Sequence, residues 1–233
     1  MRALLFDIDG TLTVGGGAGS RALGRALHTR PRATEELRNM RLDGMTDRLI
    51  ARALLATEGD HALPLPERMK AVTEAEIDAV LAKYLEALET ACAEHPYRPL
   101  PGVEALLQAL QKRDDVILGI CTGNLERGAL LKLRSAGLWG PFRFGGYGSD
   151  AEPRAEIVKA AWKRAQALGA SEGLVIGDTS RDILAAHDAG LPACAVATGR
   201  FTVHELAEHG AEMVLASFAD TAATERMLAG PLR

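Results

Sequence analysis

Short runs of apolar residues occur at four places in the chain, and each run ends at a small, acidic or hydroxyl-bearing residue. The runs do not alternate with polar residues, which is typical of strands buried on both faces of a sheet. Helical patterns, with apolar residues three and four positions apart, lie between the later runs. Such alternation predicts right-handed βαβ units and a parallel sheet. The predicted strands are Ala3 to Phe6, Val116 to Ile120, Leu174 to Ile176 and Ala193 to Ala197.

The first two predicted strands are separated by much more chain than a crossover needs. From Ser20 to about His95 the apolar spacing indicates a small bundle of helices. We therefore predict an α/β protein with a Rossmann-like parallel-sheet core of residues 1–14 and 98–233 and an inserted α-helical cap of residues 15–97.

Glycine and proline residues border the predicted insertion. Gly15, Gly16 and Gly17 lie on one side, and a proline cluster that begins at Pro96 lies on the other. Glycine gives backbone freedom and proline gives stiff turns, so the borders are either hinges of a mobile lid or ordinary surface loops.

Composition narrows the possible partners. The 233 residues carry 27 Lys and Arg against 31 Asp and Glu, a net charge of −4, and 47% are hydrophobic. This excludes full-chain disorder and gives no basic field for nucleic acid or a membrane surface. Cys92, Cys121 and Cys194 are odd in number and far apart, which disfavours a disulfide framework and structural zinc. No apolar stretch reaches the length of a membrane span, and we expect a cytoplasmic protein without a signal peptide.

Two carboxylates follow the first predicted strand. Asp7 and Asp9 are separated by one residue and precede a Gly10-Thr11 turn. Paired acids can divide their roles, one acting as nucleophile or metal ligand while the other donates and accepts a proton. Alternatively, Asp7 ends the strand and Asp9 stabilises the turn.

Polar residues also follow two later strands. Thr122, Gly123 and Asn124 offer hydroxyl and backbone N–H donors to an anion, or else cap a helix. Asp178 and Asp182 offer the hard oxygen ligands that Mg²⁺ accepts, or else cap the next helix and lie in its first turn. The carboxyl ends of parallel strands meet at one edge of a sheet, which is where ligands bind in this class of fold.

Together these motifs resemble those of the haloacid dehalogenase-like hydrolase superfamily, and more narrowly its phosphoglycolate phosphatase-like branch. In that branch a helical cap enters between the first and second motifs. The segment from Leu42 to Asp47 also resembles the Gly-x-Thr-Asp segment of such caps. Because cap surfaces in this branch often pair, we expect a monomer or a homodimer.

The resemblance implies a role for each motif residue. Asp7 would be the nucleophile that forms an aspartyl-phosphate, and Asp9 would protonate the leaving alcohol and then activate water. Thr122 would bind the phosphoryl oxygens, with Gly123 and Asn124 contributing to substrate binding.

The resemblance also implies a Mg²⁺ cofactor. Asp7, Asp178 and the backbone carbonyl of Asp9 would hold the ion, with Asp182 in or next to that shell. The implied activity is Mg²⁺-dependent hydrolysis of a small phosphorylated metabolite, similar to phosphoglycolate. The second acid, Asp9, argues against dehalogenation. A sugar-phosphate mutase of the same superfamily and a non-catalytic phosphate-ligand sensor remain as alternatives.

The sequence departs from the family at the residue that would supply a positive charge next to the phosphate. Family members usually place a lysine before a proline between the second and last motifs, whereas Glu152 stands there in this chain. We predict that Arg154 supplies the charge, with Lys159 in reserve, because a guanidinium binds phosphate oxygens bidentately. The alternative is that Arg154 forms a surface pair with Asp150 or Glu156.

Several cap residues are candidates for substrate recognition. Arginines there would favour a second anionic group, such as the carboxylate of phosphoglycolate, unless they are solvated surface charges. The candidates are Arg21, Arg41, Thr46, Asp47 and Arg48.

Overall fold

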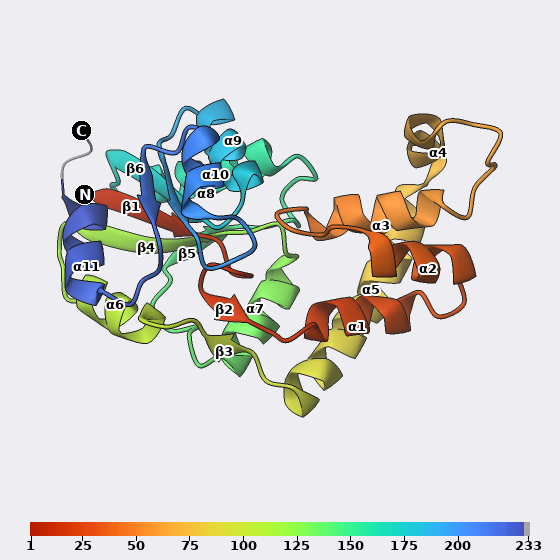
Figure 1. Cartoon of the computed structure of the whole chain (residues 1–233), viewed down its shortest axis with the longest axis horizontal. Coiled ribbons are helices and arrows are strands. Elements are labelled where there is room, and N and C mark those ends of the chain that lie inside the picture. Colours follow the sequence, from red (N-terminus) through yellow and green to blue (C-terminus); the bar gives the residue numbers. More distant parts are fainter. Residues whose placement is uncertain (231–233) are drawn as a thin grey trace.

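The computed structural model describes residues 1–230 and contains a six-stranded, wholly parallel sheet with helices on both faces (Figure 1). The strand order is β5-β4-β1-β6-β7-β8, which confirms the predicted Rossmann-like α/β core. The strands are β1 (Arg2–Phe6), β4 (Val116–Cys121), β5 (Phe144–Gly146), β6 (Glu172–Gly177), β7 (Ala193–Val196) and β8 (Met213–Leu215).

The central strand β1 explains why the apolar run is unbroken. All five of its residues are buried, with Leu4 and Phe6 in the hydrophobic core on one face and Ala3 and Leu5 in the core on the other. Because β1 lies between β4 and β6, the residue that follows it, Asp7, lies at the middle of the sheet edge.

Six helices cover the two faces of the sheet. The helices α6, α7 and α11 contribute to the core that contains Leu4, whereas α8, α9 and α10 contribute to the core that contains Leu5. Their bounds are α6 (Val103–Leu110), α7 (Glu126–Ser135), α8 (Arg154–Ala167), α9 (Ser180–Asp188), α10 (Val203–Glu208) and α11 (Thr221–Ala229).

The insertion consists of five helices that lie to one side of the sheet (Figure 1). The chain leaves the core at β2 (Thr13–Val14) and returns at β3 (Arg98–Pro99), and these two strands pair antiparallel. The pairing brings the two ends of the insertion together near residues 14 and 98. The division of the chain into two domains there stays a prediction. The cap helices are α1 (Ala18–Ala26), α2 (Pro31–Asn39), α3 (Asp47–Ala56), α4 (Leu65–Ala71) and α5 (Glu74–Glu94). Within residues 1–230, no helix has the length and apolar character needed to cross a membrane.

Several short or exposed elements carry no hydrophobic pattern that could be recognised in the sequence, among them β5, β8, α2 and α4. The strands β5 and β8 have three residues each, too few for a recognisable run. The helix α2 buries only Ala33, and α4 buries no residue, so neither has an apolar stripe.

Candidate active site

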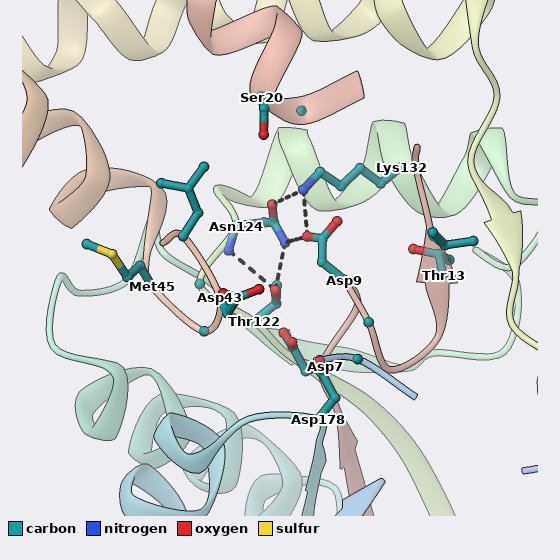
Figure 2. A pocket seen from close by; sticks show the side chains of 18 of the residues that line it. Asp7, Asp9, Thr13, Ser20, Asp43, Met45, Thr122, Asn124, Lys132 and Asp178 are labelled. Carbon is teal, nitrogen blue, oxygen red and sulfur yellow. Dashed lines mark hydrogen bonds and ion pairs between the residues drawn. The ribbon is translucent and has the colours of Figure 1, made fainter. Parts of the chain in front are cut away.

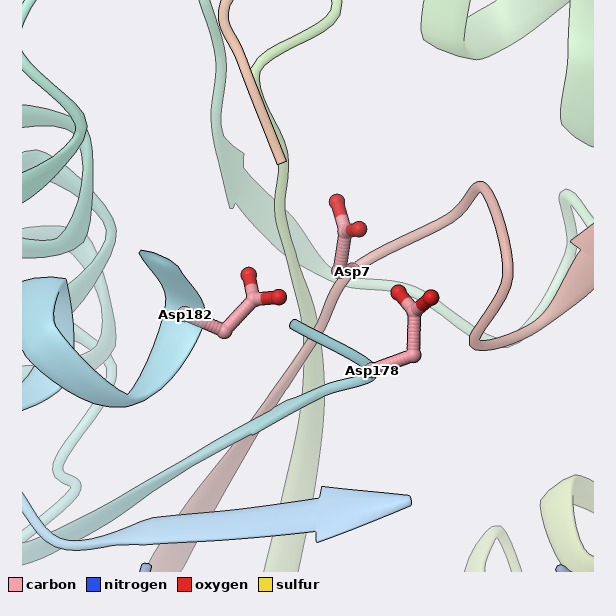
Figure 3. Close-up of side chains that lie close together, drawn as sticks. All are labelled: Asp7, Asp178 and Asp182. Atoms are coloured by element: carbon pink, nitrogen blue, oxygen red, sulfur yellow. The ribbon is translucent and has the colours of Figure 1, made fainter. Parts of the chain in front are cut away.

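Three buried carboxylates form the floor of the site. Asp7 follows β1, Asp178 follows the neighbouring strand β6, and Asp182 lies in the first turn of α9. One oxygen of each lies within 4.8 Å of the others, and all three side chains point toward a common space (Figure 3). The structure thus brings together three of the acids expected at the cation, and their role as metal ligands stays a prediction.

The floor concentrates negative charge in a buried place. Burial raises the pKa of Asp7 to about 6 even though Arg154 lies beside it, and burial together with Asp182 and Asp7 raises the pKa of Asp178 to about 8. A cation beside these buried carboxylates would stabilise their ionised forms, and carboxylate oxygens are the hard ligands that suit Mg²⁺.

Two glycines leave room for the carboxylate of Asp178. A Cβ at Gly10 would lie 2.3 Å from Asp178 Oδ2, and a Cβ at Gly199 would lie 1.7 Å from the same atom. Gly10 also has φ +82°, which side-chain-bearing residues rarely adopt. The glycines thus let Asp178 reach the floor, and the fit to a Mg²⁺ ion rests on the oxygen donors of the three carboxylates.

Asp182 binds partners with both of its oxygens. Oδ2 accepts hydrogen bonds from the backbone N–H of Thr179 at 3.0 Å and from its hydroxyl at 2.6 Å, while Oδ1 accepts from Arg154. The N-cap of α9 is therefore Thr179 and not Asp178. Asp178 Oδ1 accepts a hydrogen bond from the hydroxyl of Thr11 at 3.2 Å, whereas both oxygens of Asp182 have partners, one of which is Arg154.

Arg154 lies at the beginning of α8 and reaches the floor. Its Nη2 is 3.0 Å from Asp7 Oδ1, and its side chain is only 10% exposed. Although burial opposes the charge, Asp182 and Asp7 hold the pKa of Arg154 well above its usual value. The alternative of a surface pair is not observed, because Asp150 pairs with Arg164.

Lys159 is not brought to the site. Its ammonium pairs with Glu156 at 2.7 Å on the exposed side of α8, and half of its side chain is exposed. Arg154 and Lys159 are five residues apart, so they project from different sides of the helix. The positive charge next to Asp7 therefore comes from Arg154.

Asp9 is held by a second group of residues on the cap side of the floor (Figure 2). Asn124 Nδ2 donates to Asp9 Oδ2 and to Thr122 Oγ1, both at 2.8 Å. Lys132 Nζ donates to the same Asp9 oxygen at 2.6 Å and also to Asn124 Oδ1. Thr122 is not a helix cap, since α7 begins only at Glu126.

The sequence analysis missed Lys132. Its side chain is 5% exposed, it lies on α7, and its Nζ is 5.5 Å from the ring centroid of Tyr97. Burial opposes its charge, yet the neighbouring Asp9 holds the pKa of Lys132 well above its usual value. The available signal was its position on the apolar stripe of the helix, three residues after Ala129 and next to Leu133.

Thr46 joins the cap to the core. Its hydroxyl donates to the backbone carbonyl of Glu152 at 3.1 Å and accepts from Leu49 N–H as the N-cap of α3. The adjacent Asp47 accepts from Leu125 N–H at 2.9 Å. The structure thus places Thr46, a predicted substrate ligand, in a contact between cap and core.

Gly123 allows this close approach. A Cβ there would lie 2.5 Å from the carbonyl oxygen of Met45, and Asp47 N–H donates to the carbonyl of Gly123 at 2.8 Å. Besides its predicted role at the phosphoryl group, the glycine therefore provides a docking surface for the cap loop.

A cavity of about 540 Å³ lies between the floor and the cap. Thr46, Lys159 and Asp182 are not among the residues that line it. Eight of the residues singled out from the sequence do line it, namely Asp7, Asp9, Asp47, Thr122, Gly123, Asn124, Arg154 and Asp178.

Solved structures share this fold over nearly their whole length. A hydrolase from Pseudomonas syringae is 24% identical with a TM-score of 0.72, covering 98% of this chain and 99% of its own. CbbY from Rhodobacter sphaeroides, solved with phosphate, is 22% identical with a TM-score of 0.69 and coverages of 94% and 95%. A candidate phosphoglycolate phosphatase from Lactobacillus delbrueckii subsp. bulgaricus is 21% identical with a TM-score of 0.66 and 98% coverage of both chains.

The sequence was also compared with family models and with curated proteins. No curated protein matched. The model of the haloacid dehalogenase-like hydrolases matches residues 1–190, which include the cap and all of the floor. The motif residues and the parallel sheet agree with that match, and the chain belongs to the haloacid dehalogenase-like hydrolase family.

Proposed function

We propose that this chain is a Mg²⁺-dependent phosphatase that hydrolyses a small organic phosphate monoester through an aspartyl-phosphate on Asp7. One observation carries the proposal: a carboxylate that can attack phosphorus, a second acid, a hydroxyl donor and a buried guanidinium line one cavity. These groups are Asp7, Asp9, Thr122 and Arg154. Phosphoryl transfer needs little beyond a nucleophile, correct positioning and positive charge.

In the first step, a carboxylate oxygen of Asp7 attacks phosphorus and the bond from phosphorus to the alcohol oxygen breaks. Asp9 gives its proton to that oxygen, and a neutral alcohol leaves. Arg154 and the hydroxyl of Thr122 donate hydrogen bonds to the phosphoryl oxygens, where negative charge is spread in the transition state.

In the second step, water attacks the phosphorus of the aspartyl-phosphate. Asp9, now ionised, accepts a proton from that water, and the bond between phosphorus and the Asp7 oxygen breaks. Inorganic phosphate leaves, and both acids return to their starting states.

Asp7, Asp178 and the backbone carbonyl of Asp9 would hold the Mg²⁺ ion, with Asp182 beside them through its contact with Arg154. When bound, the ion neutralises charge on the phosphoryl oxygens. The raised pKa values of Asp7 and Asp178 support a cation at this place.

The predicted phosphoglycolate-like substrate depended on arginines in the cap. Arg21 donates to the carbonyl of Gly16, and Arg48 pairs with Glu74 and Asp78. Neither these two arginines nor Arg41 lines the cavity. The cap arginines therefore do not support a phosphoglycolate-like substrate, and the proposed activity is hydrolysis of a phosphate monoester.

The direct test is phosphate release from p-nitrophenyl phosphate with and without Mg²⁺. We expect turnover that needs Mg²⁺ and is abolished in Asp7→Asn, while Glu35→Gln, which changes an exposed carboxylate on α2, behaves as the unmodified chain. Full activity of Asp7→Asn would contradict the aspartyl-phosphate. Isomerised sugar phosphate without free phosphate would indicate a mutase, and phosphate binding without any turnover would indicate a sensor.

A further inference from the structure

The part of the cavity beyond Asp9 must receive the alcohol if the proposed function holds, because Asp9 has to reach the ester oxygen. We call this part the alcohol chamber. It lies between the core and the cap, above the floor shown in Figure 2. It is lined by Leu23, Ile50, Leu81, Tyr84, Tyr97, Asp47 and Lys132.

Three cap helices give the chamber an apolar wall. Leu23 comes from α1, Ile50 from α3 and Leu81 from α5, and each is less than 8% exposed. Burying carbon atoms of a ligand against this wall is favourable, whereas burying a charge there without a partner is costly.

The charged side chains that line the chamber within residues 1–230 are two carboxylates and one ammonium, so the chamber carries a net negative charge. Two carboxylates, Asp9 and Asp47, face it, and the ammonium of Lys132 already donates to Asp9 and Asn124. A carboxylate on the ligand would therefore be buried among like charges.

The other cations that line the cavity within residues 1–230 are also paired. Arg154 binds Asp7 and Asp182, and Arg200 at the exposed rim lies 3.7 Å from Asp43. Neither guanidinium is on the apolar wall. The distribution of charge thus disfavours a phosphorylated carboxylic acid and favours an uncharged alcohol.

Polar atoms gather next to Gly19, at one end of the chamber. A Cβ placed on Gly19 would lie 3.3 Å from the hydroxyl of Tyr97 and 3.9 Å from both the hydroxyl of Tyr84 and Lys132 Nζ. The glycine therefore leaves open a space that two phenol hydroxyls and an ammonium surround. Hydroxyls both donate and accept, so this space suits a neutral hydroxyl group of a ligand.

We propose that the substrate is the phosphate monoester of an uncharged alcohol with a further hydroxyl group. That hydroxyl binds between Tyr84, Tyr97 and Lys132, and the carbon chain packs against Leu81 and its apolar neighbours. The inference rests on the proposed phosphatase function and specifies which alcohol that function accepts.

The experiment compares three small phosphates of nearly equal size in the presence of Mg²⁺. We expect kcat/KM for 2-hydroxyethyl phosphate to exceed that for 2-phosphoglycolate by about tenfold or more, and that for ethyl phosphate by several-fold. A value for phosphoglycolate equal to or above that for hydroxyethyl phosphate overturns the inference.

Variants locate the origin of the preference. In Tyr84→Phe and Tyr97→Phe, the ratio of kcat/KM for hydroxyethyl phosphate to that for ethyl phosphate should fall by roughly threefold or more. In Asp47→Asn, phosphoglycolate should gain several-fold relative to hydroxyethyl phosphate, whereas Glu35→Gln should change neither ratio. Unchanged ratios in all three chamber variants would contradict the proposed contacts.

Different results would refute the phosphatase function and the preference for an uncharged alcohol. If neither p-nitrophenyl phosphate nor any of the three esters releases phosphate, the phosphatase function is wrong and the inference falls with it. If p-nitrophenyl phosphate is hydrolysed but phosphoglycolate is preferred over hydroxyethyl phosphate, only the inference is wrong.

Discussion

The floor and the roof of the same cavity are built in opposite ways. The floor consists of buried charges at strand ends, where Arg154 bridges Asp7 and Asp182. The roof is the apolar wall of the alcohol chamber, which consists of side chains from three cap helices, such as Leu81 of α5. Charges that act on phosphorus need fixed positions, which a parallel sheet supplies. An apolar roof favours groups that match its shape, so under the proposed function the cap would select the alcohol.

Between these two regions lies the group formed by Asp9, Asn124 and Lys132. It is anchored on the core, since Lys132 comes from α7, but it faces the chamber under the cap. Substitutions in the floor, where charge is essential, should therefore have the largest effects, and substitutions in the contacts that only hold the cap on the core should have the smallest.

The largest effect is expected from the floor. Arg154→Met leaves Asp7 and Asp182 without their shared cation and removes a donor from the phosphoryl group, so kcat/KM for p-nitrophenyl phosphate should fall by roughly 100- to 1,000-fold. Lys159→Met, on the exposed side of the same helix, should stay within about twofold of the unmodified chain. Equal losses in both variants would show that Arg154 is not the cation of the site.

The next effect concerns the residues between floor and roof. Lys132→Met removes the ammonium that holds Asp9, and we expect kcat/KM for an alkyl phosphate to fall by roughly 10- to 100-fold. The loss should be smaller for p-nitrophenyl phosphate, because its leaving phenolate has less need of a proton from Asp9. Lys83→Met, an exposed lysine on α5, serves as the control. A loss that does not depend on the leaving group would mean that Lys132 does not act through Asp9.

The same contrast explains what the sequence could predict. The positions of Asp7 and Asp178 in the site could be predicted because a buried strand fixes where the residue after it must lie. The position of Arg154 could be predicted because it lies at the beginning of a helix. Lys132 was missed because a lysine in a helix is usually solvated, and only its place on the apolar stripe beside Ala129 and Leu133 indicated that it is buried. The roof was likewise not predictable, because Thr46 finds its partner, the carbonyl of Glu152, only across the contact between cap and core, whereas Arg21 and Arg48 bind other residues of the cap.

A moderate effect on stability is expected where the roof meets the core. Burial raises the pKa of Asp47 to about 6, despite the nearby Lys132 and the hydrogen bond from Leu125 N–H. This pKa lies above that of an aspartate in the unfolded chain. The contribution of Asp47 to the free energy of unfolding is therefore most favourable below about pH 4, and that advantage is lost as the pH rises through about 6. Asp47→Asn should therefore raise the free energy of unfolding at pH 8 by about 1–2 kcal/mol and change it little at pH 4. Denaturant titration at both pH values tests this, and a gain that is the same at both would be evidence against the shift.

The smallest effect is expected from an ion pair that joins the two regions. Arg52 of the cap donates from Nε to both carboxylate oxygens of Glu152, at 2.9 and 3.1 Å, and from Nη2 to Oε2 at 3.0 Å. Glu152 lies before Pro153, at the position where the resemblance led us to expect a lysine, and here it pairs with the cap.

Two substitutions separate the contact across the regions from a contact within the cap. Glu152→Gln weakens the pair that crosses to the core, and we expect KM to rise roughly fivefold, equivalent to about 1 kcal/mol, with kcat nearly unchanged. Glu74→Gln removes another partner of Arg52, but Glu74 lies in the cap, so cap docking and KM should be unaffected. If both variants raise KM equally, the arginine acts by stabilising the cap itself and the contrast between docking and internal packing does not hold.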